Sequence, residues 1–331
     1  MKNVEEILIR FDFFKDFGIL ADNQKNSCTG DDVRNIILTL FLLGYALAAQ
    51  AANGDTATRI RDDELASAVL SFTSAPKLRS AIALIYDEQG QNPLYAKNAD
   101  TVTPIASITK LMTAMVVLDA QLPLDDEISI SREDMDKLKG TSSRMNPGLK
   151  LTRGELLRLA LMSSENRAAA ALARTYPGGA AAAVAMMNIK ALELGMRDSR
   201  FMDPTGLNSG NVSTAQDLVK MVRAAQRYDL IQQYSTTSSY TVKPIGRGRP
   251  MRFGNTNPLV KNASWDIGVS KTGYISEAGR CLVMQARINQ RPVVIVLLDS
   301  WGNRTRIGDA NRIKKWMESA YLRAYGNPQR G

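Results

Sequence analysis

The residue pattern with the clearest catalytic potential is Ser107-Ile-Thr-Lys110, in a chain that contains no histidine. The absence of histidine excludes Ser-His-Asp and Cys-His catalysis, and also the usual ligand sets of zinc peptidases. On a helix, a serine three residues before a lysine projects from the same face, so the amine can take the hydroxyl proton. The pattern therefore offers serine hydrolysis without imidazole, although a second copy, Ser74-Ala-Pro-Lys77, makes it weak by itself.

Two further patterns follow the first in a fixed order along the chain. Ser164-Glu-Asn166 lies between two expected helices, and Lys271-Thr-Gly273 ends an expected strand. The ordered set S-x-x-K, S-x-N and K-T-G is typical of penicillin-binding proteins and class A β-lactamases. Together the three patterns indicate one catalytic site.

Longer segments around these patterns resemble the D-alanyl-D-alanine peptidases, the low-molecular-mass penicillin-binding proteins that trim peptidoglycan peptides. The segments that carry the resemblance are Gly140-Thr-Ser-Ser-Arg-Met145, Leu151-Thr-Arg-Gly-Glu-Leu-Leu157, Met162-Ser-Ser-Glu-Asn166, Asp203-Pro-Thr-Gly-Leu207 and Val269-Ser-Lys-Thr-Gly273. The chain most resembles the D-alanyl-D-alanine endopeptidases, because it shows neither the β-rich domain nor the membrane-binding helix that carboxypeptidase members usually add. The resemblance implies peptidoglycan as substrate, β-lactam antibiotics as covalent inhibitors, and chemistry that needs no cofactor or metal.

In this chemistry Ser107 attacks the D-alanyl carbonyl and forms an acyl-enzyme that water later hydrolyses. Lys110 must be uncharged to act as the base, and we expect burial and the second cation at Lys271 to lower its pKa. Ser164 is placed to pass a proton towards the leaving amine. The Asn166 amide either binds the substrate peptide or holds Lys110 in place.

The strand with the K-T-G pattern supplies the expected substrate-binding groups. Lys271 provides a cation for the substrate carboxylate and for charge that develops at the reacting carbonyl. Thr272 adds a hydroxyl donor, and Gly273 lets a substrate strand lie close against this edge. The family resemblance implies that the backbone N–H groups of Ser107 and Tyr274 form the oxyanion hole.

Each of these residues also has a purely structural interpretation. Ser107 could cap its helix, Ser164 or Asn166 could cap the next one, and Lys271-Thr-Gly could lead a strand into a turn. We interpret Asp203 as the structural carboxylate of an Asp-Pro turn. The catalytic interpretation is favoured because all three patterns occur together in the required order.

Three other functions are compatible with the same residues. A DD-carboxypeptidase that acts on uncross-linked stem peptides uses the same set. A β-lactamase would need a carboxylate to activate the deacylating water, and the loop from residue 195 to 207 contains Asp198 and Asp203 but no glutamate. A non-catalytic wall-binding or antibiotic-sensing module could retain an acylable serine. We predict an exported serine DD-endopeptidase and keep these three as alternatives.

The elements that must position these residues follow from hydrophobic periodicity. Strands are expected near both ends, at Ser80–Tyr86, Pro93–Asn98, Asp266–Thr272, Arg280–Asn289 and Pro292–Asp299. Helical spacing begins after Pro104, dominates from about residue 120 to 235, where Thr152-Arg-Gly-Glu155 predicts a capping box, and returns from about Arg306 to Tyr325. We expect an α+β, β-lactamase/DD-peptidase-like fold, in which an antiparallel sheet is flanked by helices and an all-helical subdomain is inserted.

The first fifty residues contain a candidate secretion signal. The segment from Ile36 to Ala49 carries no charge and is too short to span a bilayer comfortably. Since Ala49-Gln-Ala51 fits a small-x-small cleavage site, we expect residues 1–51 to be a leader with a signal peptide, and residues 52–331 to form a single DD-peptidase domain in the periplasm. Residues 1–32 are too long and acidic for a normal n-region, which is consistent with a start codon placed too far upstream.

Charge and cysteine content narrow the partners. The chain has 42 Lys and Arg residues and 33 Asp and Glu residues. Residues 52–331 contain 37 of the basic and 26 of the acidic residues, which gives this part a net charge of +11. The basic residues are scattered and export disfavours nucleic acid, so we expect no nucleic-acid partner. Peripheral contact with a membrane stays open, without an evident segment for it. Cys281 lies in an apolar run typical of a core.

Overall fold

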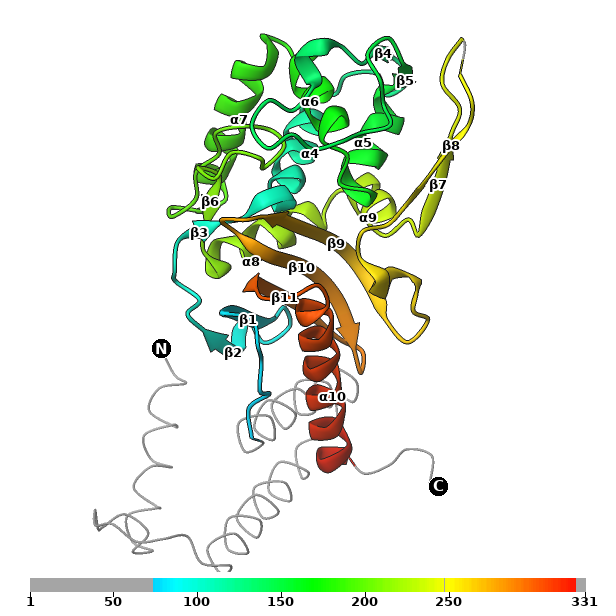
Figure 1. Cartoon of the computed structure of the whole chain (residues 1–331). Coiled ribbons are helices and arrows are strands. Elements are labelled where there is room, and N and C mark those ends of the chain that lie inside the picture. The colour runs from blue at the N-terminus through cyan, green and yellow to red at the C-terminus, as the bar shows by residue number, and fades with distance from the viewer. Residues whose placement is uncertain (1–73, 247, 326–331) are drawn as a thin grey trace, which may run out of the picture. The chain divides into compact units, whose positions relative to one another are not determined.

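Strands from both ends of the described chain form one five-stranded antiparallel sheet (Figure 1). The computed structural model describes residues 74–246 and 248–325, which belong to one unit of the chain, Ile60–Gly331. The strands are β1 (Ile82–Asp87), β2 (Asn92–Lys97), β9 (Asp266–Ile275), β10 (Gly279–Ile288) and β11 (Arg291–Ser300). Their order is β2-β1-β11-β10-β9, with every neighbouring pair antiparallel. The predicted antiparallel sheet is confirmed.

Both faces of this sheet are buried. In β11 the side chains at positions 294, 296 and 298 face one hydrophobic core, while those at 293, 295 and 297 face a second. This alternation is the period of two that a strand imposes, and the apolar, β-branched run suits a strand covered on both sides. In the β10–β11 hairpin, Asn289 and Gln290 both have positive φ, 50° and 65°, as in the turns that match strand twist.

One helix covers each face of the sheet. On one face α10 (Thr305–Tyr325) packs along β10 and β11 through Ile313 and Met317 (Figure 1). On the other face α8 (Ala215–Ala225) packs against β1, β10 and β11 through residues such as Leu218. The sheet is therefore the middle layer of a three-layer arrangement.

The remaining helices gather beside β9 and form what we call the helical lobe (Figure 1). They are α4 (Lys110–Asp119), α5 (Arg153–Met162), α6 (Asn166–Arg174), α7 (Gly179–Glu193) and α9 (Asp229–Ser235). The predicted capping box opens α5, where Thr152 and Glu155 each accept the other's backbone N–H. Because α4 contacts α5, α6, α7, α8 and α9, the helix that follows Ser107 lies at the centre of the lobe.

Short elements that the sequence did not predict complete the fold. β3 (Thr103–Pro104) pairs with β6 (Val212–Ser213), β4 (Glu127–Ser129) with β5 (Lys150–Thr152), and β7 (Ser239–Val242) with β8 (Met251–Gly254). The 3₁₀ turns are η2 (Ala106–Thr109), η3 (Arg132–Asp134) and η4 (Pro258–Lys261). The segment from residue 120 to 235 thus holds short strands besides its helices, because two or three residues are too few to show a period.

The strand β9 is longer than the sequence indicated. We expected it to end at the K-T-G pattern, near Thr272, but it continues to Ile275. The reason is its ladder with β10, in which Gly273 pairs with Cys281 and Tyr274 with Arg280. Pairing along the ladder outweighs the low strand propensity of glycine. The K-T-G pattern therefore lies inside an edge strand of the sheet.

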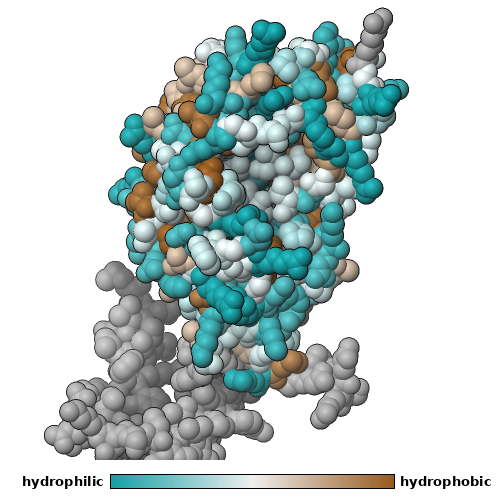
Figure 2. All heavy atoms as spheres, viewed as in Figure 1, coloured by the Kyte–Doolittle hydropathy of each residue, from teal (hydrophilic) through white to brown (hydrophobic). Residues whose placement is uncertain are grey.

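The N-terminal leader and signal peptide predicted at residues 1–51 lie outside the described residues. Among the helices of residues 74–246 and 248–325, none has the length and apolar character needed to cross a membrane. On the face shown in Figure 2, hydrophilic side chains predominate and the hydrophobic ones are scattered. The thiol of Cys281 is buried in the core, as its apolar surroundings in the sequence suggested.

Candidate active site

Ser107 and Lys110 lie where η2 continues into α4, and Lys110 Nζ is 2.8 Å from Ser107 Oγ. The first turn is a 3₁₀ helix rather than the expected α-helix. It begins at Ala106, whose φ of 47° is a left-handed conformation that costs about 1–2 kcal/mol. Gly206 packs so closely on this peptide that a Cβ would lie 2.0 Å from Ala106 O. A tight backbone contact therefore holds the strained turn that carries the serine.

Lys110 is almost completely buried, with 1% of its surface exposed. Besides the serine, its Nζ contacts Asn166 Oδ1 at 2.7 Å and the Thr205 carbonyl at 2.6 Å. Burial lowers the pKa of Lys110 to about 7, although the negative charges of Asp203 and Glu165 act in the opposite direction. At neutral pH a large fraction of this amine is therefore uncharged, as a general base requires.

Lys271 and Ser164 form a second hydrogen-bonded pair. Lys271 is 1% exposed, and its Nζ donates to Ser164 Oγ and to the Thr272 carbonyl, both at 2.8 Å. Burial lowers the pKa of Lys271 well below its usual value, and the cations of Lys110 and Arg306 lower it further. The sequence analysis expected burial and this repulsion to lower the pKa of Lys110; in the structure burial is the main cause at Lys110, as expected, and the repulsion acts on Lys271.

The edge strand β9 brings the K-T-G residues against η2. A Cβ at Gly273 would lie 3.0 Å from Ile105 O and 3.1 Å from Ser107 N, so a side chain here would displace its neighbours. Tyr274 is 56% exposed, and the Arg280 guanidinium stacks on its ring, 4.4 Å from the centroid. The N–H groups of Ser107 and Tyr274, which the resemblance implied for an oxyanion hole, thus belong to adjacent backbone segments.

Comparison with known proteins identifies the family that shares this arrangement. Residues 70–302, which contain all three motifs, match the family described as D-alanyl-D-alanine carboxypeptidase. The chain belongs to this family. A D-alanyl-D-alanine endopeptidase of Pseudomonas aeruginosa is 48% identical over 248 residues, 75% of this chain and 80% of the relative. The D-alanyl-D-alanine endopeptidase of Escherichia coli is 45% identical over 253 residues, 76% of this chain and 82% of the relative.

Solved structures of DD-peptidases share the fold. The Streptomyces K15 DD-transpeptidase superposes with a TM-score of 0.70 at 30% identity, covering 75% of this chain and 100% of that one. Penicillin-binding protein D2 of Listeria monocytogenes, in its cefotaxime-bound form, gives 0.65 at 26% identity, covering 74% and 99%. The predicted fold and family are confirmed, and with them the enzyme class, a serine-type D-alanyl-D-alanine peptidase.

In this DD-peptidase, a loop that the sequence analysis treated as structural also supports Lys110. The carboxylate of Asp203 accepts the backbone N–H groups of Thr205 and of the next residue, at 3.1 and 3.0 Å, as expected of an Asp-Pro turn. This turn places the Thr205 carbonyl against Lys110. Asn211 ties the loop to η2 by donating to Thr109 Oγ1 at 3.0 Å. The segment from Asp203 to Leu207 is part of the family resemblance, but because the contact is made by a backbone carbonyl, no residue type in it revealed the contact.

Arg306, in the first turn of α10, is a site residue that the sequence analysis missed. It is 8% exposed, and among the described residues its Nε and Nη1 atoms have no hydrogen-bond partner. It lies close enough to Lys271 to lower the pKa of that amine. A buried guanidinium with unpaired donors is suited to an anionic group. The signal in the sequence was an arginine at a helix N-terminus, where the helix dipole disfavours a cation.

The Thr272 hydroxyl, the expected substrate donor, is paired with a second threonine that the sequence did not indicate. Thr272 Oγ1 donates to Thr256 Oγ1 at 2.7 Å, and the exposed Thr256 donates its N–H to Met162 O at 2.9 Å. Thr256 therefore links the K-T-G strand to the end of α5, directly before the S-x-N motif.

A cavity adjoins the partners of Lys110. It has a volume of about 310 Å³ and is lined by Asn166, Thr205 and residues of the segment from Glu133 to Leu138. In the part of the chain that the structure describes, no three His, Cys, Asp or Glu side chains gather where they could hold a metal ion. The site consists of hydroxyls, amines, an amide and a guanidinium.

Proposed function

We propose that this protein is a serine DD-endopeptidase that hydrolyses D-alanyl cross-links in peptidoglycan through an acyl-enzyme on Ser107. The observation that carries the proposal is the 2.8 Å contact between the buried Lys110 amine and the Ser107 hydroxyl, beside the edge of β9. Relatives of 48% and 45% identity are both named D-alanyl-D-alanine endopeptidase, which supports cross-links rather than stem termini as the bond that is cut.

Three side chains would carry out the bond-breaking steps. Neutral Lys110 takes the proton of Ser107 as the serine oxygen attacks the D-alanyl carbonyl, and the N–H groups of Ser107 and Tyr274 stabilise the negative charge on the carbonyl oxygen. When the tetrahedral intermediate collapses, the peptide C–N bond breaks. Ser164 gives its hydroxyl proton to the leaving amine and takes one from the ammonium of Lys271, which donates a hydrogen bond to it. Water then attacks the acyl-enzyme and passes a proton through Ser164 back to Lys271, and Lys110 returns its proton to Ser107 as the acyl C–O bond breaks.

Lys271 and Arg306 would bind a carboxylate of the substrate, and the Thr272 hydroxyl would join them by turning from Thr256 to the carboxylate. Two buried cations that repel each other are costly without a counter-ion, and an arriving carboxylate offsets the repulsion and favours the charged form of Lys271. The absence of a side chain at Gly273 lets β9 pack against η2, and the edge strand β9 can take a substrate backbone alongside it. Of the two roles considered for Asn166, its 2.7 Å contact supports the holding of Lys110.

Digestion of purified sacculi tests which bond is cut. We expect cross-linked muropeptide dimers to disappear and monomers to accumulate, and we expect the Ser107→Ala variant to leave the dimers intact. Release of terminal D-alanine without loss of dimers would replace the proposal with DD-carboxypeptidase activity, for which the same residues suffice. Failure to cut any muropeptide would favour the non-catalytic sensor.

We also propose that β-lactam antibiotics acylate Ser107. The support is the same serine and amine, together with the cefotaxime-bound form of the Listeria neighbour. Mass spectrometry of peptides from the benzylpenicillin-treated protein should find a long-lived adduct on Ser107. Rapid turnover of benzylpenicillin would instead indicate a β-lactamase.

We further propose that the protein is exported to the periplasm, where it would remodel the cell wall and influence cell shape. The support lies in the sequence, in the uncharged run from Ile36 to Ala49 and the small residues that follow it. The mature protein in a periplasmic extract should begin just after Ala51, which N-terminal mass spectrometry measures. Recovery only from the cytoplasm, with the leader intact, would contradict export.

A further inference from the structure

A chain of hydrogen bonds runs from the loop after η3 into the base of the site. Asp136 Oδ2 accepts from both the backbone N–H and the hydroxyl of Thr141, each at 2.7 Å. Thr141 Oγ1 in turn lies 3.0 Å from Asn166 Nδ2, and Asn166 Oδ1 lies 2.7 Å from Lys110 Nζ. Four residues from three separate parts of the chain are thus connected in one line that ends at the proposed general base.

The carboxylate at the far end fixes the direction of every bond in this line. Although partial burial acts in the other direction, hydrogen bonds from the amides of Lys139 and Thr141 and from the Thr141 hydroxyl lower the pKa of Asp136, so it stays ionised and can only accept. The single proton of the Thr141 hydroxyl is therefore committed to Asp136. Its oxygen can only accept from Asn166, which turns the amide nitrogen towards Thr141 and the amide oxygen towards Lys110.

This orientation of the Asn166 amide decides where the lone pair of Lys110 points. A neutral amine has two hydrogens and one lone pair. The two hydrogens are taken by two groups that can only accept, Asn166 Oδ1 at 2.7 Å and the Thr205 carbonyl at 2.6 Å. The remaining neighbour, Ser107 Oγ at 2.8 Å, then faces the lone pair and can deliver its proton to it.

We propose that Asp136 and Thr141 are positioning residues, which aim the Lys110 lone pair at Ser107 by fixing the amide of Asn166. The proposal rests on the proposed function of Ser107 and Lys110. Without the hydrogen bond to Thr141, the amide of Asn166 is free to rotate by half a turn and present an N–H to Lys110. The lone pair would then accept from Asn166 instead of from the serine, and the first proton transfer would lose its acceptor.

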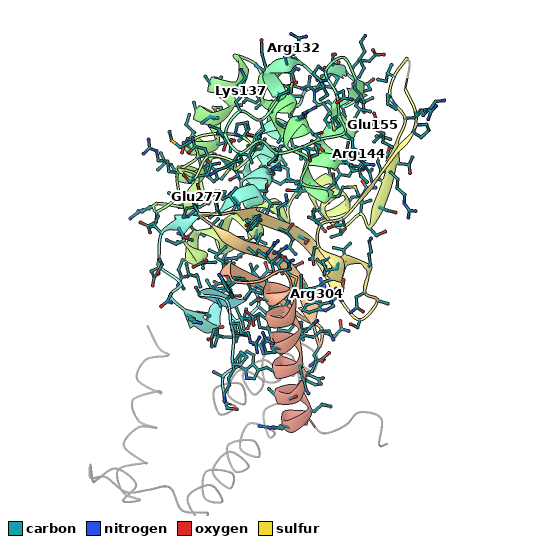
Figure 3. The ribbon with its side chains drawn as sticks, in the orientation of Figure 1. Arg132, Lys137, Arg144, Glu155, Glu277 and Arg304 are labelled. Atoms are coloured by element: carbon teal, nitrogen blue, oxygen red, sulfur yellow. The ribbon has the colours of Figure 1, made fainter. Side chains whose placement is uncertain are left out.

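Residues on both sides of Thr141 anchor its loop to other elements, as expected of a loop that must hold the Asn166 amide in one orientation. Lys139 forms a salt bridge with Glu277 in the β9–β10 turn. Arg144 donates to Arg252 O at 2.7 Å and lies over the Phe253 ring, 4.3 Å from its centroid. Figure 3 shows Arg144 and Lys137 on different sides of the helical lobe, with Glu277 below them, so the loop crosses the face of the lobe.

The test compares three single substitutions in this loop: T141V, T141S and S142A. T141V removes the hydroxyl at nearly constant volume, T141S keeps it, and S142A changes an exposed neighbour as the matched control. The rate of acylation by benzylpenicillin is measured from about pH 5 to pH 10. The charged groups that face Lys110, which are Lys271, Asp203 and Glu165, are the same in all three variants.

For T141V we expect a limiting rate about ten- to a hundredfold lower, the cost of misaligning a reacting group. The midpoint of its acidic limb should move to lower pH, because an amide N–H turned towards an ammonium disfavours the charged form. T141S should restore both quantities, and S142A should match the wild type. D136N, in which the acceptor is no longer charged, should change in the same direction as T141V.

An unchanged limiting rate and midpoint in T141V would overturn the proposal. A midpoint that moves to higher pH would also overturn it, because that is the effect of water entering a merely loosened site. Thermal unfolding of each variant establishes that it is folded, and T141V decides the question should D136N fail to fold. Absence of any adduct on Ser107 in the wild type would refute the proposed function itself. That result differs from one in which the wild type is acylated normally and T141V behaves like it, which would refute only the positioning role of Asp136 and Thr141.

Discussion

Acylation by benzylpenicillin should follow the ionisation of Lys110. The pKa of this buried amine is about 7, against 10.5 for the free side chain. A difference of roughly three and a half pKa units corresponds to about 5 kcal/mol. At pH 7 about half of the amines are uncharged, whereas an unshifted lysine would be uncharged in only about 0.03% of molecules. The lowered pKa should therefore raise the concentration of active base by a factor on the order of 1,000.

The assay is the pseudo-first-order rate of adduct formation on the wild type and on Lys110→Arg. For the wild type the rate should rise with pH and reach half of its plateau near pH 7, since the neutral amine is the active form. Lys110→Arg should be slower by about 1,000-fold or more throughout, because a guanidinium stays charged at every pH tested. A midpoint near the ordinary lysine value, a rate without pH dependence, or normal acylation of the arginine variant would each refute the general-base argument.

Three further outcomes follow from single residues. Arg306→Leu should lower kcat/KM about ten- to a hundredfold for a peptide substrate with a free carboxylate, and much less for the same peptide with that carboxylate converted to an amide. An equal loss of kcat/KM for both peptides would contradict carboxylate binding. Gly206→Ala should lower the free energy of unfolding, measured in urea, by more than about 2 kcal/mol, because the φ of Gly206 is 81° and an added Cβ would meet Ala106 O. An unchanged midpoint of urea unfolding would contradict the close contact between Gly206 and Ala106. Cys281, whose pKa burial raises to about 12, should resist iodoacetamide until the protein unfolds, and rapid labelling of the native protein would contradict its burial.

Signals that act over a few residues were enough to predict the sheet and the motif positions. The apolar, β-branched run of β11 and the capping box before α5 each depend on neighbours in the chain. The prediction failed where long-range pairing decides. The strand β9 extends past Thr272 because β10 supplies partners for Gly273 and Tyr274, and no property of those two residues alone requires it.

By itself, therefore, the sequence determined which reactive groups the protein has and roughly which elements carry them. Only the tertiary structure decided the state of those groups. The contacts of Lys110 come from Asn166, 56 residues away, and from Thr205, 95 residues away, and the second of these is a backbone carbonyl. The physical reason is that the pKa and the aim of a buried amine depend on all the atoms around it, and packing brings those atoms from distant segments together. The same reason explains why Arg306 and the line from Asp136 to Lys110 became visible only in the folded chain.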